Sequence, residues 1–377
     1  MDLQRLAERA RAATQNRPDA PDAVPPPETA PRRRRGRLTR LRLTMWAVAL
    51  VALLAFLEIR VFRPRFGAKG RQAVSQAVAV PPGEAVSALG AEGLSLRGLR
   101  EVTPAFLAPL SVLGPEAVSA QAAQKVVSQE NRLPIEVENS IGMRFRLIPN
   151  GSFLMGSPAE ETGRWDGEVQ HVAVVDAPFY MGAFEVTQKQ WRAVMGGNPS
   201  RFTGDSRPVE EVTWYQCQEF VRKLAEREGL AKWTYRLPTE VQWEYACRAG
   251  GGTAFHYGND PAKLGGFDWV DVNSAGRPHP VGGLLPNGYG LHDLHGNLWE
   301  WCADPFRNYP GYTGKDQPAE ALDGWRVIRG GNWYLPAVDC RSAARSRLSS
   351  TSHGNMLGFR VVRVIPELAA PAESAAE

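Results

Sequence analysis

Two segments are most informative about the fold class: Pro286-Asn-Gly-Tyr-Gly-Leu-His-Asp-Leu-His-Gly-Asn-Leu-Trp-Glu-Trp301 and Arg329-Gly-Gly-Asn-Trp333. Glycines and amides between tryptophans give neither the 3.6-residue period of an amphipathic helix nor the alternation of a strand. We therefore expect a loop that is held by specific contacts. The carboxylates of Asp293 and Glu300, together with backbone carbonyls, are ligands that suit a hard cation.

The composition divides the 377 residues unevenly. Ten of the eleven tryptophans lie between Trp165 and Trp333, whereas the sequence before about residue 133 is rich in Arg, Pro and Ala. One folded domain over 133–366 is expected, and it is long enough to bury a core without disulfides. The net charge of +4 comes largely from N-terminal arginines that are not interleaved with aromatics, so no nucleic-acid partner is predicted.

An apolar run favours a membrane anchor. Residues 43–57 carry no charge, and extension to Phe62 gives the ~20 residues that a transmembrane helix needs. Seven arginines lie between Arg32 and Arg42, against five basic residues between Arg60 and Arg71, which favours a cytoplasmic N-terminus and a periplasmic or other extracytoplasmic C-terminal domain. A buried core helix and a cleaved signal peptide are the alternatives. The Arg- and Pro-rich flank argues against the first, and the long leading segment against the second.

The segments around this predicted transmembrane helix (43–62) are low in apolar periodicity. Residues 1–42 are predicted to be a disordered Arg- and Pro-rich cytoplasmic tail, and 367–377 a disordered C-terminal tail. Residues 63–132 are rich in Ala, Ser and Pro and are predicted to be a flexible stalk, with short helical pieces near Ala117–Val127.

The domain itself is predicted to be α+β, with short antiparallel strands, few helices and long loops. Strands are expected at 143–148 and 358–363, with a strand pair formed by 171–175 and 179–184. Three helices are expected to begin at Thr-x-x-Gln capping boxes, which start at Thr187, Thr213 and Thr239. After Gly250 the chain is expected to be mostly loop until the last strand.

A family resemblance rests on motifs that occur in order from Asn139 to Arg363: NSIGMRF, FYMGAFEVTQKQW, RPVEEVTW, YRLPTEVQWEYACRAG, GNLWEW, RGGNW and GFRVVR. Together they closely resemble the formylglycine-generating enzyme (sulfatase-modifying factor) family over about 225 of the 377 residues. The resemblance implies an irregular α+β fold related to C-type lectins. The family contains copper-dependent oxidases that convert a sulfatase cysteine to formylglycine, nonheme iron enzymes, siderophore-maturation proteins and domains without known catalysis.

The resemblance argues against copper chemistry in this chain. The oxidases use two thiols five residues apart, because two soft thiolates make a near-linear Cu(I) site. Here the serine of their GGS motif is Asn332, and the first thiol position holds Leu335. Cys340 takes the second position in a gap-free alignment. If CRSAAR is anchored on the family's RCAARS instead, Cys340 is the neighbour of Ser342, which then replaces a structural cysteine. At most one thiol remains, and Cys340 is a catalytic candidate only if the protein is an enzyme.

Other site residues also follow from the resemblance. It pairs Cys247 with Cys340 in a disulfide, displaced by two residues from the family position. It implies a Ca²⁺ site formed by a side-chain oxygen, two carbonyls and a glutamate, at Asp293, Gly296, Leu298 and Glu300. The alternative is that Asp293 and Glu300 pair with arginines or cap turns. A second Ca²⁺ site could use Asp268, Asp271 and Asn273.

Two further hypotheses concern iron and a ligand surface. His292 and His295 flank Asp293, and histidine with carboxylate is the usual ligand set of nonheme iron; turn-stabilising histidines are the alternative. A candidate ligand surface comprises Arg329 and Arg345, which could bind a carboxylate or sulfate, with Trp299, Asn332 and Trp333. Structural ion pairs are the alternative for these arginines.

These observations favour a membrane-anchored extracytoplasmic domain that binds an unknown protein or small ligand, is stabilised by Ca²⁺ and lacks copper chemistry. The alternative function is an enzyme of the same family, either a formylglycine-generating oxidoreductase or a nonheme iron oxidase. A scaffold in an envelope assembly is a third class.

Overall fold

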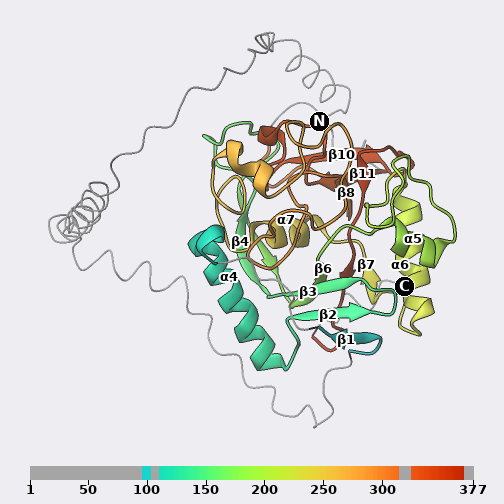
Figure 1. Cartoon of the computed structure of the whole chain (residues 1–377). Helices are drawn as coiled ribbons and strands as arrows, with labels where there is room; N and C mark the ends of the chain where they lie inside the picture. Colours follow the sequence, from blue (N-terminus) through green and yellow to red (C-terminus); the bar gives the residue numbers. More distant parts are fainter. Residues whose placement is uncertain (1–95, 103–109, 314–323, 369–377) are drawn as a thin grey trace, which may run out of the picture. The chain divides into compact units, whose positions relative to one another are not determined.

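A computed structural model describes residues 96–102, 110–313 and 324–368 (Figure 1). Its largest sheet has six antiparallel strands in the order β1 (Leu99–Glu101), β2 (Glu136–Asn139), β3 (Arg144–Ile148), β6 (Phe179–Gly182), β12 (Val362–Arg363) and β7 (Tyr235–Arg236). Both faces of its central strands are covered, and Phe145, Leu147 and Tyr180 are fully buried. The last strand of the described domain thus lies in the middle of the sheet, beside β6.

A second sheet has four strands in the order β10 (Arg345–Ser349), β9 (Trp325–Arg329), β8 (Trp299–Pro305) and β11 (Leu357–Gly358). Only the short β8–β11 pair is parallel among its ladders. A third sheet pairs β4 (Gly151–Met155) with β5 (His171–Val175). The pairing predicted between 171–175 and 179–184 is therefore wrong, because β5 pairs with β4 whereas β6 joins the six-stranded sheet.

The three predicted capping boxes are confirmed. Thr187, Thr213 and Thr239 precede α5 (Gln188–Met195), α6 (Trp214–Arg227) and α7 (Glu240–Arg248), and in each the threonine and the glutamine three residues later satisfy each other's backbone amides. Helix α7 is buried along most of its length and contacts β4 and β5 on one side and β8 and β9 on the other. Figure 1 shows it in the middle of the domain. Two short 3₁₀ helices, η1 (Pro261–Gly266) and η3 (Ala337–Asp339), shape the loops.

The described end of the predicted stalk is packed against the domain. The helix expected near Ala117–Val127 is present but runs over 22 residues as α4 (Leu110–Asn131), which contacts β3. Ala120, Gln124 and Val127 are buried because they recur on one helical face. The Gln124 Nε2 donates to the carbonyls of Leu147 and Tyr289 at 2.8 and 3.0 Å. The described parts of this segment, β1 paired with β2 and α4 packed on β3, therefore belong to the packed structure.

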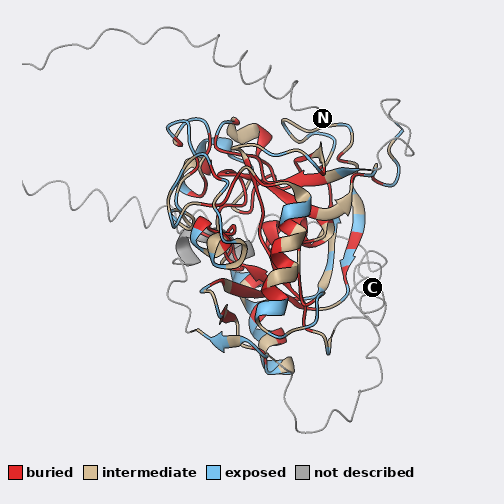
Figure 2. Cartoon of the chain, turned by 90° about the vertical axis from the view of Figure 1, so that its right-hand side faces the viewer, coloured by how far each residue is buried: buried red, intermediate tan, exposed pale blue. Residues whose placement is uncertain are grey.

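The core is built from aromatic side chains and buried ions. Trp243, Trp299 and Trp301 are fully buried, and so are Arg329 and Arg360. Figure 2 shows that buried segments gather in the middle of the folded domain and exposed ones at its periphery. The architecture is mixed α+β with few helices and curled antiparallel sheets, as predicted.

Several predictions fall on residues that the structure does not describe. The cytoplasmic tail (1–42), the transmembrane helix (43–62), the first part of the stalk and most of the C-terminal tail lie outside the described ranges. Within residues 96–102, 110–313 and 324–368, no helix combines the length and apolarity needed to cross a membrane.

Candidate functional site

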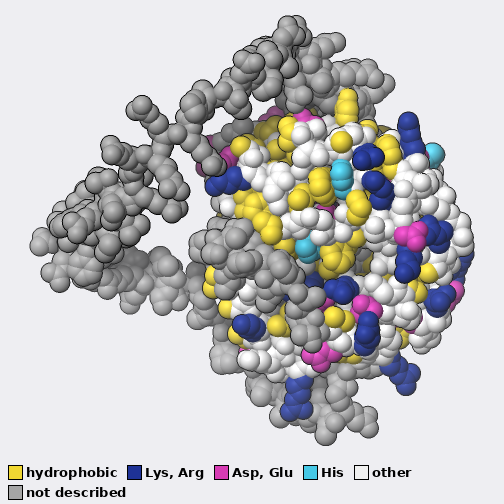
Figure 3. Space-filling view, viewed as in Figure 1, with side chains coloured by type: hydrophobic (Ala, Val, Ile, Leu, Met, Phe, Trp, Pro, Cys, Tyr) yellow, Lys and Arg dark blue, Asp and Glu magenta, His cyan; other side chains and the backbone are white. Residues whose placement is uncertain are grey.

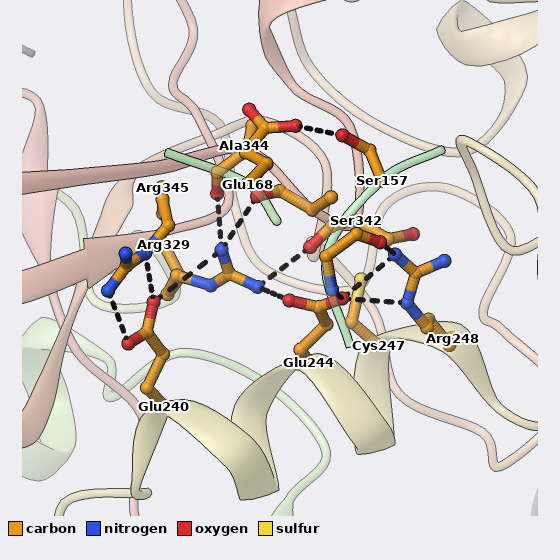
Figure 4. Close-up of polar contacts among 12 residues, drawn as sticks. Ser157, Glu168, Glu240, Glu244, Cys247, Arg248, Arg329, Ser342, Ala344 and Arg345 are labelled. Atoms are coloured by element: carbon orange, nitrogen blue, oxygen red, sulfur yellow. Dashed lines mark hydrogen bonds and ion pairs between the residues drawn. The ribbon is translucent and has the colours of Figure 1, made fainter. Parts of the chain in front are cut away.

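The arginines of the candidate ligand surface are buried in ion pairs (Figure 4). The Arg329 Nη2 pairs with Glu244, and its Nη1 donates to the carbonyls of Ala343 and Ala344 at 2.9 Å each. Arg345 binds both oxygens of Glu240 at 2.7 and 2.8 Å. These two guanidiniums therefore tie α7 to β9 and β10 and do not present an anion-binding surface. The structural alternative for them is confirmed.

The rest of that surface borders an apolar cleft of about 280 Å³. The cleft lies at the four-stranded sheet, where β8, β10 and β11 meet the loop after β9. Its lining side chains are mostly apolar: Trp299, Tyr334, Leu335, Leu348, Met356 and Leu357. Asn332 also lines it, and its Oδ1 accepts the Tyr334 amide at 2.8 Å. Trp333 is buried behind this loop, with its Nε1 donating to the Asn355 carbonyl at 3.0 Å.

One thiol lies near this cleft, and it is enclosed. Leu335 occupies the cleft wall, whereas Cys340 is fully buried. The Cys340 Sγ packs so closely on Gly331 that a Cβ at that glycine would lie 2.3 Å from the sulfur. Burial raises the pKa of the Cys340 thiol well above its ordinary value, so the sulfur is protonated. Among the described residues, the cleft therefore offers no second thiol, and its other sulfur is the thioether of Met356.

The disulfide expected between Cys247 and Cys340 is not formed in the structure, where all four cysteines are free and buried. The Cys247 Sγ lies 3.6 Å from the Nε2 of His295. Ser342 lies beside Cys247, as Figure 4 shows. This placement favours the alignment in which Ser342 replaces the family's structural cysteine. A hydroxyl at that position leaves Cys247 without a sulfur to bond.

At the first candidate Ca²⁺ site, the Glu300 carboxylate is already bound by other side chains. Glu300 accepts the Arg360 Nη2 at 2.6 Å, the Arg360 Nε at 2.7 Å and the Trp243 Nε1 at 2.7 Å. The Asp293 Oδ2 accepts the Gly282 amide at 2.7 Å, while its buried Oδ1 has no partner within the described chain. The predicted alternative, an arginine pair, holds for Glu300.

Two further carboxylates lie close to Asp293: Glu185, which the prediction did not include, and Asp268, which it assigned to the second candidate site. Burial, with Asp293 and Glu300 nearby, raises the pKa of Glu185 well above its ordinary value. Burial and Asp293 do the same for the pKa of Asp268, and burial raises the pKa of Asp293 itself to about 6. The nearby Arg360 guanidinium opposes this rise in the pKa of all three carboxyls. The excess negative charge and the unpartnered Asp293 Oδ1 fit a divalent cation, although Glu300 is occupied by Arg360.

Side chains alone do not form a complete set of cation ligands at either candidate Ca²⁺ site in the described residues. In the described part of the chain, no three His, Cys, Asp or Glu side chains converge as a metal ion would require. At the second candidate site, the Asp268 Oδ2 accepts the His295 amide at 2.5 Å and the Asn273 Oδ1 accepts the Val270 amide at 2.7 Å. These contacts stabilise turns. A cation here would therefore depend on backbone carbonyls such as those of Gly296 and Leu298.

The two histidines beside Asp293 point into different surroundings. The His292 Nδ1 donates to the Leu284 carbonyl at 2.9 Å, and the His295 Nδ1 donates to the Cys340 carbonyl at 2.8 Å. Burial lowers the pKa of each ring to about 4, so both are neutral at neutral pH. Their contacts match the turn-stabilising alternative.

The comparisons with known proteins agree with this architecture. Residues 131–365 match the family described as the sulfatase-modifying factor enzyme 1-like domain. The chain belongs to this family. Its match to a chaperone protein LppX from Paenibacillus barcinonensis has 31% identity and covers 49% of this chain and 80% of that protein.

Two enzymes are also similar to this family member. A formylglycine-generating enzyme from Streptomyces coelicolor is 31% identical over 49% of this chain and 60% of the enzyme. A hercynine oxygenase from Mycolicibacterium smegmatis is 32% identical over 53% of this chain and 56% of that protein. This family member thus spans little more than half the length of these two enzymes.

Solved structures show the same fold. The Treponema denticola variable protein 1 is 27% identical with a TM-score of 0.53, covering 61% of this chain and 99% of its own. PvdO from Pseudomonas aeruginosa has the same identity and TM-score, covering 59% of this chain and 95% of its own.

Proposed function

We propose that this family member is a membrane-anchored extracytoplasmic domain that binds a partner and does not carry out dithiol copper chemistry. The observation that carries the proposal is the apolar cleft, in which Leu335 stands where the resemblance expects the first copper thiol. A leucine side chain offers Cu(I) no ligand. Cys340 is buried behind the cleft, against Gly331. The predicted transmembrane helix at 43–62 supplies the anchor.

The chemistry of the cleft suits an apolar side chain of a protein partner. Its volume of about 280 Å³ lies just below the ~300–1,000 Å³ of pockets that hold whole small molecules. The indole Nε1 of Trp299 is buried without a hydrogen-bond partner in the described chain, and would donate to an oxygen carried by the occupant. The similarity to a protein named as a chaperone supports a protein partner.

The absence of copper chemistry can be tested on the purified full-length chain. A Cys-x-Pro-x-Arg peptide, Cu(I) and oxygen should give no aldehyde by mass spectrometry. Leu335→Cys places a thiol five residues before Cys340, but it should not increase Cu(I) retention against a chelating competitor, because Cys340 is enclosed and protonated. Aldehyde formation by the unaltered chain would overturn the proposal.

Partner binding at the cleft can be tested by photo-crosslinking in cells. A crosslinking residue at Tyr334, which is 39% exposed at the cleft, should capture a discrete protein. The matched control is Tyr215 on α6, which is 55% exposed and does not line the cleft. The same adducts from both positions, or none from Tyr334, would argue against a binding cleft.

An enzymatic function is the second candidate, and the similarity to hercynine oxygenase and to formylglycine-generating enzymes favours it. The purified chain would then retain iron or copper in stoichiometric amounts. His292→Ala would lower that content if iron is bound. A chain that carries neither metal supports the binding domain instead.

We include in this proposal a bound Ca²⁺ that stabilises the folded domain. Asp293, through its unpartnered Oδ1, would hold Ca²⁺ together with the carbonyls of Gly296 and Leu298. Glu300 would contribute only by sharing its oxygens with Arg360.

A further inference from the structure

A second cavity, of about 450 Å³, lies in a different part of the domain. We call it the arginine pocket and define it by Glu136, Arg144, Arg146, Phe184, Gly290 and His292. These residues come from β2, from β3, from the turn after β6 and from the loop that precedes β8. The arginine pocket and the apolar cleft share no lining residue.

The wall of the arginine pocket carries an excess positive charge. Arg146 pairs with Glu136 through Nη1, and its Nε donates to the Tyr289 carbonyl at 2.9 Å. The Arg144 Nη1 lies 3.7 Å from the same Glu136, so two guanidiniums share one carboxylate of the pocket. Outside the pocket, Glu138 lies 3.6 Å from Arg144 but is also paired with Arg100. These three arginines and two glutamates leave one uncompensated cation.

Arg146 also retains an unused donor. Its side chain is 3% exposed, and its Nη2 has no hydrogen-bond partner within the described residues. Leaving such a group buried and unpaired is destabilising, and more so when it is charged. Gly290 faces this guanidinium, since a Cβ there would lie 2.7 Å from Nη2. A side chain at Gly290 would therefore clash with the guanidinium, and the glycine allows Arg146 to lie at the wall of the pocket.

The remaining walls are uncharged. His292 donates from Nδ1 to the Leu284 carbonyl at 2.9 Å, which leaves Nε2 as a neutral acceptor. The Phe184 ring lies 5.0 Å from the His292 ring, centre to centre. Leu284, Leu285 and Pro286 extend this apolar side. The pocket therefore combines a cationic wall with an aromatic and aliphatic wall.

We propose that the arginine pocket binds a small organic monoanion, namely a carboxylate on an aromatic or aliphatic body. Arg146 and Arg144 bind the carboxylate, and Phe184 packs against the body. One excess positive charge balances a monoanion and leaves a dianion such as sulfate undercompensated. The volume lies within the ~300–1,000 Å³ of ligand pockets.

The test uses phenylacetate as the probe, with isothermal calorimetry on the purified full-length chain. Its neutral isostere phenylacetamide should bind at least tenfold more weakly, as expected for a lost charge-assisted hydrogen bond of about 1.5–3 kcal/mol. Sulfate should not displace phenylacetate at equal concentration. No phenylacetate binding, equal binding of phenylacetamide, or displacement by sulfate would each overturn the proposal.

Variants locate the binding. Arg144→Gln changes a half-exposed side chain and should weaken phenylacetate about tenfold while the melting temperature is kept. Arg146→Lys keeps the charge but removes the planar fork, and should weaken binding similarly. Arg192→Gln is the control, because Arg192 pairs with Asp205 on the surface outside the pocket. Unchanged affinity in Arg144→Gln, or an equal loss in Arg192→Gln, would refute the assignment even if Arg146→Lys does not fold.

Discussion

Replacing Ser342 with cysteine is expected to create a disulfide bond with Cys247. Both side chains are fully buried and lie side by side at the junction of α7 with the loop before β10. The bond would close a loop of about 95 residues. This lowers the conformational entropy of the unfolded chain and should raise the free energy of unfolding by about 4.7 kcal/mol at 25 °C. At about 2–4 °C per kcal/mol for a domain of 150–250 residues, the melting temperature should rise by about 9–19 °C.

The assay compares melting with and without reductant and counts thiols in denaturant. The variant has one cysteine more than the four free cysteines of the structure, and a bond would use two and leave three. Ser342→Ala controls for loss of the hydroxyl, and Ser342→Cys with Cys247→Ala controls for the added sulfur. Five titrating thiols after oxidation, with no effect of reductant on melting, would show that the two side chains are not placed as described.

Three other predictions concern stability. Glu244→Gln should cost about 3–5 kcal/mol in urea unfolding, because it removes the carboxylate that two buried arginines share: Arg248, and Arg329, whose other carboxylate partner Glu240 lies 3.8 Å away. Glu226→Gln on the exposed face of α6 should change stability by less than about 1 kcal/mol. Equal losses in the two variants would contradict the buried-pair argument. Removing the threonine of a capping box should cost about 1 kcal/mol at each helix, measured as shifts in denaturation midpoint for Thr187→Ala, Thr213→Ala and Thr239→Ala. Adding Ca²⁺ after EGTA should raise the melting temperature of the unaltered chain but not of Asp293→Ala, and an identical response of both would remove Asp293 from the calcium proposal.

The surface of the domain adds one observation on partners. Figure 3 shows one face on which basic and acidic side chains are interspersed among uncharged ones, without a single continuous basic patch. On this face, recognition would therefore rest on local pockets more than on a broad electrostatic field.

Local signals in the sequence predicted local structure well. The helix starts followed from Thr-x-x-Gln because the reciprocal cap depends only on residues three apart. The strand at 171–175 was also predicted with its observed bounds, although its partner was not. Strand pairing is a long-range choice, and the alternation within β5 is satisfied equally by either neighbour. The four-stranded sheet was missed because Trp299–Pro305 and Arg345–Ser349 mix aromatic, acidic and basic residues, whose charges are buried as pairs.

At the candidate site, too, the sequence predicted local features and missed those that depend on distant residues. The sequence identified Leu335 and Asn332, and the structure places both at the apolar cleft. It could not show that Arg329 is enclosed, because the Glu244 that neutralises it lies 85 residues away in the chain. The sequence analysis also missed Glu185, one of the carboxylates near Asp293. Its position could have indicated a buried role, because it is the one charged residue between Phe184 and Val186 in an apolar segment.

The strand β1 has a mechanical consequence. Among the described residues, a tension applied along the chain from the N-terminal side acts on the Arg97 carbonyl, which accepts the Arg363 Nη2 at 2.7 Å, and then on Leu99–Glu101, which are held to β2 at the edge of the largest sheet. So short a ladder yields at a lower load than the buried centre around Phe145 and Tyr180. Pulling would therefore detach β1 before the load reaches the buried centre of this sheet.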